Sequence, residues 1–148
     1  MKIGIANDHS GVDYKNALVK YISEKYGYEV INYGTDTSDS VNYAVYGEKV
    51  ANAIKNKEID RGIVICGTGI GISLACNKVK GIRCAVCSEP LSAKLSRLHN
   101  DANIVSMGAR MIGLEMVKEI VDVFLTTEFE GGRHKERIAY LEQIENRQ

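Results

Sequence analysis

The stretch "VICGTGIGIS", residues 64–73, indicates both the kind of fold and the kind of chemistry to expect of this chain. It passes from an apolar segment typical of a strand into Cys66 and then into a loop with three glycines in the next five residues. Successive free backbone N–H groups that open a helix near residue 70 form a nest for an anion, and their field favours thiolate. A base beside an oxyanion cradle suits proton abstraction next to a carbonyl. A tight turn around a small buried cysteine is the alternative.

Three common motifs of glycine-rich and cysteine loops do not fit this stretch. A P-loop ends in Gly-Lys-Ser/Thr, whereas the first lysine after the loop is Lys78. The dinucleotide fingerprint requires a third glycine at position 72, which is Ile72. The arginine of a cysteine-dependent phosphatase loop would fall on Ile72 as well.

The composition is that of one ordinary domain. The 148 residues, of which 45% are apolar, suffice for a single core, residues 1–148. Lys plus Arg balance Asp plus Glu at 19 each, so no net field attracts nucleic acid or an anionic membrane. The chain shows no secretory signal and no run near the roughly 20 apolar residues of a membrane span. We therefore expect a cytoplasmic protein.

Four cysteines are expected to be free thiols rather than a disulfide framework. Cys84 and Cys87 spell C-x-x-C, which is compatible with a thiol redox protein or a zinc site. However, "IRCAVC" is typical of a strand, where positions three apart point to opposite faces. The pattern favours a structural role for both.

Short β-rich runs alternate with helical patterns along the chain. Near-continuous apolar runs predict parallel strands covered on both faces, at 2–6, 29–33, 61–66, 82–87 and 102–107. Apolar periodicity predicts helices at 11–25, 44–56, 70–78, 89–99 and 112–125, the fourth with Ser88 as N-cap. We expect an α/β protein, a three-layer α/β/α sandwich around a five-stranded, parallel, Rossmann-like sheet. Residues 132–148 are predicted to form a helical tail that packs on the domain or on a partner subunit.

The polar residues that are candidates for the site lie at opposite ends of the predicted strands. Asp8 and His9 come after the first strand, and the 66–71 loop comes after the third, where ligands of open α/β sheets bind. The segment "HNDAN", residues 99–103, instead leads into the beginning of a strand. These residues cannot all share one cavity within a single subunit, which indicates a site at an interface.

Basic residues near the C-terminus predict a phosphate site. Arg133 and Arg137 lie one helical turn apart with His134 beside them, and Arg110 just past the fifth strand can join them. The alternative for these basic residues is an ordinary solvated face of a helix. For Asp8, the alternative is a role as a helix N-cap and nothing more. The sequence shows no metal-ligand spacing, so no metal site is expected.

Four blocks of sequence resemble the ribose-5-phosphate isomerase type B family, which includes the galactose- and allose-6-phosphate isomerases. They are "NDHSG" (7–11), "CGTGIGISLACNK" (66–78), "GIRCAVCSEPLSAKLSRLHNDANI" (81–104) and "GGRHKERI" (131–138). The resemblance implies a cofactor-free aldose–ketose isomerase of the pentose phosphate pathway. Its substrates would be ribose 5-phosphate and ribulose 5-phosphate, interconverted through a cis-enediolate.

The same resemblance implies a role for each matching residue. Cys66 is the base, Thr68 adds a hydroxyl, and His99 with Asp8 opens the sugar ring. The residues implied to bind the substrate are His9, Gly67, Gly69, Ile70, Gly71, Asn100, Arg110, Arg133 and Arg137. Further candidates near the site are Tyr43, Asn103 and His134.

Relatives of this kind form homodimers or homotetramers with shared sites, which implies the same here. They often carry Tyr-Pro where this chain has Tyr43 followed by Ala44, so the range of sugars stays open. Allose 6-phosphate or galactose 6-phosphate are alternative substrates. A flavodoxin-like ligand-binding module is an alternative of another class, although the chain has no tryptophan and two phenylalanines for stacking.

Overall fold

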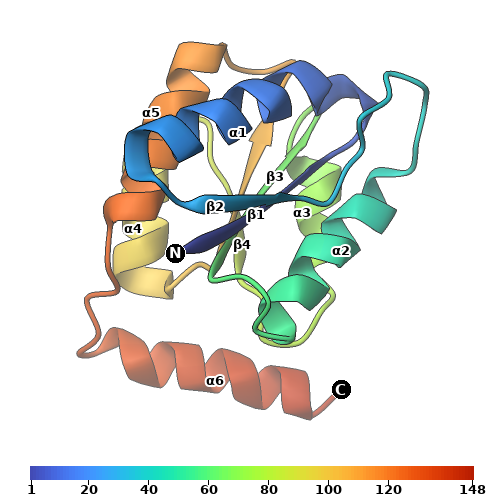
Figure 1. Ribbon diagram of the computed structural model, residues 1–148. Coiled ribbons are helices and arrows are strands. Elements are labelled where there is room, and N and C mark those ends of the chain that lie inside the picture. Colours follow the sequence, from blue (N-terminus) through green and yellow to red (C-terminus); the bar gives the residue numbers. More distant parts are fainter.

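The computed structural model describes residues 1–148 and contains five strands and six α-helices in a layered α/β arrangement (Figure 1). The strands are β1 (Lys2–Asn7), β2 (Glu29–Asn32), β3 (Arg61–Cys66), β4 (Cys84–Val86) and β5 (Ile104–Gly108). The helices are α1 (Val12–Tyr26), α2 (Tyr43–Lys55), α3 (Ile70–Asn77), α4 (Pro90–Asn100), α5 (Leu114–Thr126) and α6 (His134–Asn146), with one 3₁₀ turn, η1 (His9–Gly11). The predicted alternation of strands and helices is confirmed.

All neighbouring strands are parallel, in the order β2-β1-β3-β5-β4. Every residue of β3 and β5 is buried, as expected for strands covered on both faces. The register pairs Cys66 with Gly108 and Gly62 with Ile104. Cys66 and Gly108 therefore lie together where the strands have their carboxyl ends, which we call the carboxyl edge of the sheet. Gly62 and Ile104 lie toward the opposite side, where the strands have their amino ends, which we call the amino edge.

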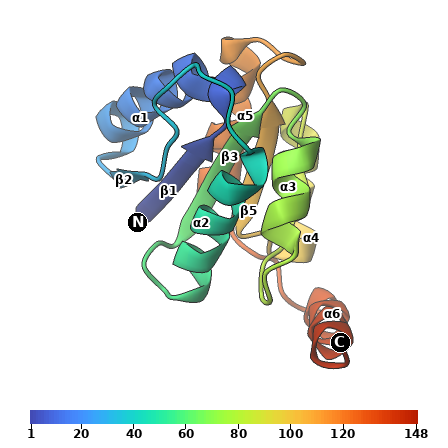
Figure 2. The same ribbon diagram turned by 90° about the vertical axis from the view of Figure 1, so that its right-hand side faces the viewer.

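Helices cover both faces of the sheet (Figure 2). Side chains of α1, α4 and α5 form one core cluster with the sheet, including Leu18, Ala93 and Phe124. Side chains of α2 and α3, such as Val50 and Ile72, form the second. These two cores confirm the three-layer sandwich.

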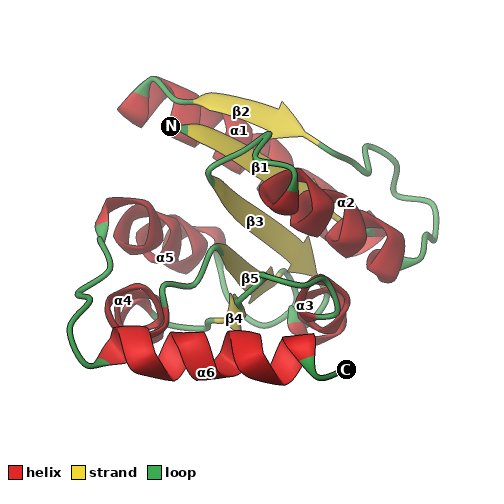
Figure 3. Ribbon diagram, turned by 90° about the horizontal axis from the view of Figure 1, so that it is seen from below, coloured by secondary structure: helices red, strands yellow, loops and turns green.

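Helix α6 lies outside the three layers and runs across the molecule at the amino edge of the sheet (Figure 3). Only His134 and Ile138 of this helix are buried. Leu141 and Ile144 in its second half are 46% and 39% exposed. The tail is thus the predicted helix, and it packs on its own domain mainly through its first turns. No helix of the structure has the length and apolar character needed to cross a membrane.

Two element ends differ from the sequence prediction for local reasons. Ser88 is not the N-cap of α4: Glu89 is, because its extended backbone lets Oε2 accept from the Ser92 N–H at 2.9 Å. The fifth strand begins two residues later than predicted, since Asp101 adopts a left-handed conformation (φ 45°) at the end of α4. Ala102 then still belongs to that turn, with its N–H bound to the carbonyl of Ser96.

Candidate active site

The predicted site residues form two groups at opposite edges of the sheet. The carboxyl-edge group follows the ends of β1, β3 and β5 or opens α2, and it includes Asp8, His9, Tyr43, residues 66–71 and Arg110. The amino-edge group follows the end of α4 or opens α6 and includes His99, Asn100, Asn103, Arg133, His134 and Arg137. Ile104 and Gly108 bound β5 and are about 13 Å apart, at a rise of about 3.3 Å per residue. The two groups are thus separated within one subunit, and a site at an interface stays a prediction.

Cys66 lies against the backbone amides that open α3. Its Sγ accepts a hydrogen bond from the N–H of Gly69 at 3.1 Å, and the side chain is buried. The next amide, that of Ile70, donates to Oγ1 of Thr68 at 3.1 Å. The following N–H groups of the first helical turn have no partner within the helix. An N–H dipole aimed at sulfur stabilises a thiolate, and the remaining amide N–H groups can donate hydrogen bonds to a bound anion.

The end of β5 holds this loop in place through backbone contacts. Gly69 has φ 80°, and a Cβ there would lie 2.8 Å from the carbonyl carbon of Met107, so only glycine fits. Three hydrogen bonds connect the two segments: Ser106 Oγ to Gly69 O at 2.5 Å, Ala109 N to Cys66 O at 2.8 Å, and Arg110 N to Gly67 O at 3.0 Å. The amide cradle is therefore fixed by the sheet rather than by a mobile loop.

Asp8 and His9 at the end of β1 have defined hydrogen bonds. Asp8 Oδ1 accepts from the N–H and hydroxyl of Ser10 at 2.9 and 2.5 Å, so Asp8 does cap η1 as the alternative interpretation proposed. Its second oxygen accepts no hydrogen bond within the protein. His9 Nδ1 accepts from the N–H of Val41 at 3.2 Å. In the neutral ring this leaves Nε2–H as a donor for a ligand.

Tyr43 and Arg110 flank the glycine loop. A Cβ on Gly71 would lie 2.7 Å from Cζ of Tyr43, so the tyrosine ring lies directly on the loop. A Cβ on Gly67 would lie 3.4 Å from Nη1 of Arg110, which places a guanidinium beside the cradle. Both predicted residues thus join the carboxyl-edge group. The N–H of Ala44 donates to Oδ1 of Asn42, the N-cap of α2, at 3.0 Å.

At the amino edge, His99 and His134 stack with ring centroids 4.5 Å apart. The Oε2 atom of Glu130 lies 3.9 Å from Nε2 of His99 and 3.6 Å from Nε2 of His134. His134 is 4% exposed and its Nε2 has no hydrogen-bond partner. Burial, together with the charges of His99 and Arg133, lowers the pKa of His134, so its ring is neutral. Sequence reasoning missed Glu130, whose only signal is its position four residues before His134.

The other amino-edge residues have separate roles. Arg133 and Arg137 are exposed at the start of α6, free to bind an anion from outside the subunit. Asn103 does not join them: its Oδ1 accepts from the N–H of Arg83 at 2.9 Å, and its Nδ2 donates to the carbonyl of Gly81 at 2.9 Å. The candidate Asn103 therefore serves the fold, because both ends of its amide are used within the chain.

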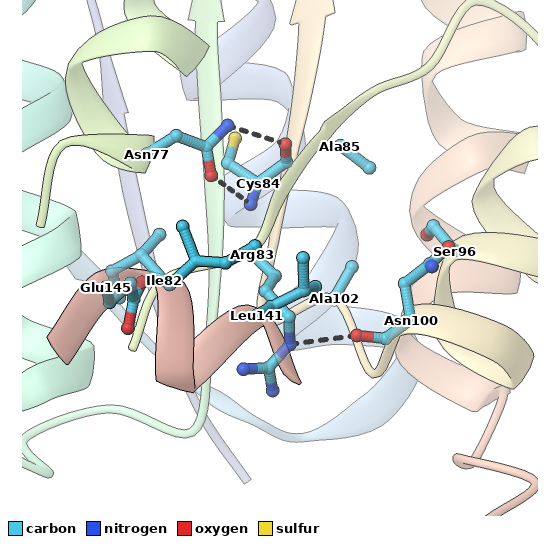
Figure 4. A pocket seen from close by; sticks show the side chains of 11 residues that line it. Asn77, Ile82, Arg83, Cys84, Ala85, Ser96, Asn100, Ala102, Leu141 and Glu145 are labelled. Atoms are coloured by element: carbon cyan, nitrogen blue, oxygen red, sulfur yellow. Dashed lines mark hydrogen bonds between the residues drawn. The ribbon is translucent and has the colours of Figure 1, made fainter. Parts of the chain in front are cut away.

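The largest cavity, about 460 Å³, lies between α6 and the end of the sheet near β4 (Figure 4). Asn100 borders it, and its carbonyl accepts from Nε of Arg83 at 2.9 Å. Leu141 and Ile144 of α6 line the apolar side. Cys66 does not line this cavity; a smaller one of about 180 Å³ borders Thr68. Neither cavity alone contains a complete catalytic set.

Cys84 and Cys87 are placed for structure rather than redox exchange. They belong to the two separate cores on opposite sides of the sheet, which confirms the strand prediction. A hydrogen bond with Cys76 and burial raise the pKa of Cys84, and burial raises that of Cys87 to about 11. Both thiols are therefore protonated and far less reactive than a redox pair requires.

Comparison with known proteins gives matches over nearly the whole chain. The family model described as Ribose/Galactose Isomerase matches residues 3–141. Ribose-5-phosphate isomerase B of Escherichia coli (strain K12) is 49% identical over 99% of this chain and 97% of its own. A structure of Clostridium thermocellum ribose-5-phosphate isomerase B superimposes with a TM-score of 0.97 at 52% identity, covering 99% of both chains. D-erythrulose-4-phosphate isomerase of Pectobacterium atrosepticum is 40% identical over 100% of this chain and 99% of its own.

Proposed function

The chain belongs to the ribose/galactose isomerase family and is an isomerase; as its reaction we propose the interconversion of ribose 5-phosphate and ribulose 5-phosphate. The observation that carries the proposal is the contact between Cys66 Sγ and the Gly69 amide at the opening of α3. It places a base and an anion cradle side by side. The similarity to ribose-5-phosphate isomerases B over nearly the whole chain supports the choice of a five-carbon substrate.

Cys66 thiolate removes the proton from C2 of the open-chain aldose, the carbon next to the carbonyl carbon C1, and returns it to C1, while the hydroxyl proton of O2 passes to O1; the reverse reaction runs the same steps backward. As the proton leaves, negative charge grows on the oxygens of a cis-enediolate. The N–H groups of Gly71 and Ile72, which have no partner within the helix and lie at the positive end of α3, stabilise that charge. Thr68 Oγ1 is held by the Ile70 amide, so its hydroxyl hydrogen is available to the substrate. The reaction in this form needs no metal and no cofactor.

His99 opens the furanose ring as the acid, with the free oxygen of Asp8 nearby, and Asn100 contacts the sugar. His9 and Arg110 bind the substrate from the carboxyl-edge group. Arg133 and Arg137 bind the phosphate from the amino-edge group, through the bidentate contacts that guanidinium groups make with phosphate oxygens. Positioned in this way, the phosphate aligns the sugar carbons with Cys66.

Because the two groups lie at opposite edges, we assign each complete site to two subunits of a homodimer. In an isologous pair, the carboxyl-edge group of one subunit meets the amino-edge group of its partner, and the reverse holds at the second site. Exposed apolar side chains on the β4 side of the molecule support this contact: Ile70, Leu74, Val86, Leu91, Leu141 and Ile144. β4 is also an edge strand of only three residues. The apolar half of α6 would then pack against the partner.

The flavodoxin-like alternative is wrong, since the family match covers residues 3–141. Other sugar phosphates are alternatives in the same site. The relationship to a D-erythrulose-4-phosphate isomerase favours testing a four-carbon substrate, and the loop at Tyr43 and Ala44 leaves six-carbon sugars to be tested. We place the reaction in the cytoplasm, where phosphorylated sugars are retained.

The test is an isomerase assay of EDTA-treated protein with ribose 5-phosphate, erythrulose 4-phosphate, allose 6-phosphate and galactose 6-phosphate in parallel. The highest kcat/KM is expected for ribose 5-phosphate, without added metal. A higher value for another sugar would reassign the substrate within the family. Turnover of none of the four would reject the proposed function.

A further inference from the structure

The two histidines and the carboxylate at the amino edge form a set of metal ligands that the sequence did not predict. His99, Glu130 and His134 each offer one ligand atom, and these three atoms lie within 4.8 Å of one another. Both imidazole nitrogens face the same carboxylate oxygen, at 3.9 and 3.6 Å. Two imidazoles and one carboxylate are a donor set that Zn²⁺ takes in proteins.

A second, independent observation points to a ligand at this place. The imidazole of His134 is 4% exposed, and its Nε2 has no hydrogen-bond partner. The distance of 3.6 Å to Glu130 is too long for a hydrogen bond. A buried polar atom without a partner costs free energy, so a group that binds Nε2 is favoured. A cation bound between the three donor atoms satisfies it.

A metal bound here requires the three donor atoms to move closer together and the ring of His99 to rotate. Around a tetrahedral Zn²⁺ with bonds of about 2.0–2.1 Å, two donor atoms lie about 3.3 Å apart. Glu130 and His99 have side chains that are 57% and 39% exposed and can adjust toward a metal. His134 is held in place by burial, since it is 4% exposed. The ring of His99 must turn out of the stack, because a metal binds in the plane of each imidazole.

We propose that His99, Glu130 and His134 form a Zn²⁺ site and that zinc bound there inhibits the isomerase. The binding part stands on these three residues alone. The inhibitory part rests on the proposed function, in which His99 opens the sugar ring. Zinc would occupy the Nε2 lone pair of that histidine, and the metal would lie at the start of α6, near Arg133 and Arg137. Inhibition should therefore be competitive with the sugar phosphate.

The test uses the intact, metal-free protein with Co²⁺ as a spectroscopic probe and Zn²⁺ as a competitor. The visible absorption of Co²⁺ should show a site of low coordination number, and Zn²⁺ should displace the signal. Glu130→Gln should weaken binding of both ions at least about tenfold, because even partners outside the ligand shell change metal affinity by about 10–100-fold. Glu136→Gln, an exposed glutamate on the same segment, is the matched control and should bind normally.

Cysteine thiols can also bind these ions, so Cys66→Ala is titrated in parallel. Metal binding unchanged in Cys66→Ala and weakened in Glu130→Gln supports the site. Binding unchanged in Glu130→Gln, binding lost in Cys66→Ala, or no binding at micromolar Co²⁺ would overturn it. These readouts need no turnover, so they are independent of the proposed reaction.

Inhibition is measured separately, with the isomerase assay at increasing Zn²⁺. The activity of each protein is expressed relative to its own value without Zn²⁺, and on this scale Glu130→Gln should resist Zn²⁺ at least about tenfold more than the unchanged protein. Equal sensitivity of both proteins would overturn the inhibitory role. If metal binds but no sugar phosphate is turned over, the zinc site stands and the proposed function fails.

Discussion

The Sγ atom of Cys66 accepts a hydrogen bond from the backbone N–H of Gly69 at 3.1 Å. This contact joins the last residue of β3 to the N-cap residue of α3, across the tight loop between them. It explains why a thiol and a glycine-rich loop occur together in the sequence. The amide that stabilises charge on sulfur belongs to the same series that can stabilise charge on a substrate oxygen.

Replacement of Cys66 by alanine should abolish most of the activity without unfolding the protein. A positioned base contributes about 10²–10⁴-fold, so kcat for ribose 5-phosphate should fall by that factor. Steady-state kinetics and circular dichroism check both parts. Cys84→Ala, a thiol on the edge strand, is the matched control and should retain activity. Full activity in Cys66→Ala would assign the base to another residue.

Gly69→Ala should be more harmful than Gly81→Ala, although both glycines have similar left-handed φ angles of 80° and 83°. A residue with a Cβ in the left-handed conformation costs about 1–2 kcal/mol, so the free energy of unfolding of both variants should fall by this amount. At Gly69 the new Cβ also meets the backbone of Met107 at 2.8 Å, whereas at Gly81 nothing lies within 4 Å.

Denaturant unfolding should therefore show Gly69→Ala to be less stable than Gly81→Ala by at least about 1 kcal/mol, the usual cost of overpacking. The isomerase activity should fall only in Gly69→Ala, since its amide moves away from Cys66. Equal losses of stability would contradict the close packing of the loop on β5.

Arg137→Ala should act on substrate binding. The lost contacts with a charged phosphate are worth about 1.5–3 kcal/mol, so kcat/KM should fall about 10–150-fold, with a large rise in KM. Lys135→Ala removes the same charge from the same helix and should change kcat/KM little. Inorganic phosphate should inhibit Arg137→Ala more weakly than the control. An unchanged KM would place the phosphate elsewhere.

Asp122 predicts a pH-dependent contribution to stability. Burial raises its pKa, but hydrogen bonds from Tyr21, Tyr26 and Lys25 outweigh burial and hold the pKa below the usual value for an aspartate. A folded pKa below the unfolded one means that ionised Asp122 stabilises the fold above about pH 4, and that this contribution is lost as the pH falls through the folded pKa.

Tyr26→Phe removes the hydrogen bond of 2.5 Å from the tyrosine hydroxyl to Oδ1 of Asp122. The variant should lose about 1 kcal/mol in free energy of unfolding at neutral pH. The difference should shrink below about pH 4, as Asp122 becomes protonated. Urea unfolding at several pH values measures it. Tyr140→Phe, at an exposed tyrosine, should change stability at no pH; a constant difference for Tyr26→Phe would contradict the role of Asp122.

Local patterns predicted the layers and the carboxyl-edge group. The continuous apolar run of β3 marked a central strand, and the residues that directly follow strands had to meet at one edge of the sheet. The short β4 was harder to delimit, because the Asn77 side chain binds both the N–H and the carbonyl of Cys84 and so fixes where pairing begins (Figure 4).

The amino-edge cluster could not be predicted from local patterns. Glu130 meets His99 only because the chain after α5 turns back over the end of α4, where the N–H of Glu130 binds the carbonyl of Leu98 at 3.1 Å. The structural role of Asn103 depends likewise on the positions of Gly81 and Arg83. Such contacts between distant segments leave no periodic signal in the sequence.

Subunit mixing tests the assignment of each site to two subunits. Cys66→Ala damages the carboxyl-edge group, and His99→Asn damages the amino-edge group. In a heterodimer of the two variants, one site carries both changes and the other carries neither. Random pairing makes half of the dimers mixed, each with one intact site of two, so mixing should restore about a quarter of the unchanged activity. Either variant alone should be nearly inactive.

The control is a mixture of Cys66→Ala with His9→Asn, which alters two residues of the same group. Each site of that heterodimer contains one damaged carboxyl-edge group, so mixing should restore nothing. Co-expression with two different affinity tags allows the heterodimers to be isolated, and their activity is compared with that of each homodimer. If Cys66→Ala and His99→Asn fail to complement one another in an isolated heterodimer, the two groups do not form one site across the interface. The path from His99 to the sugar would then have to lie within one subunit, against the separation of about 13 Å along β5.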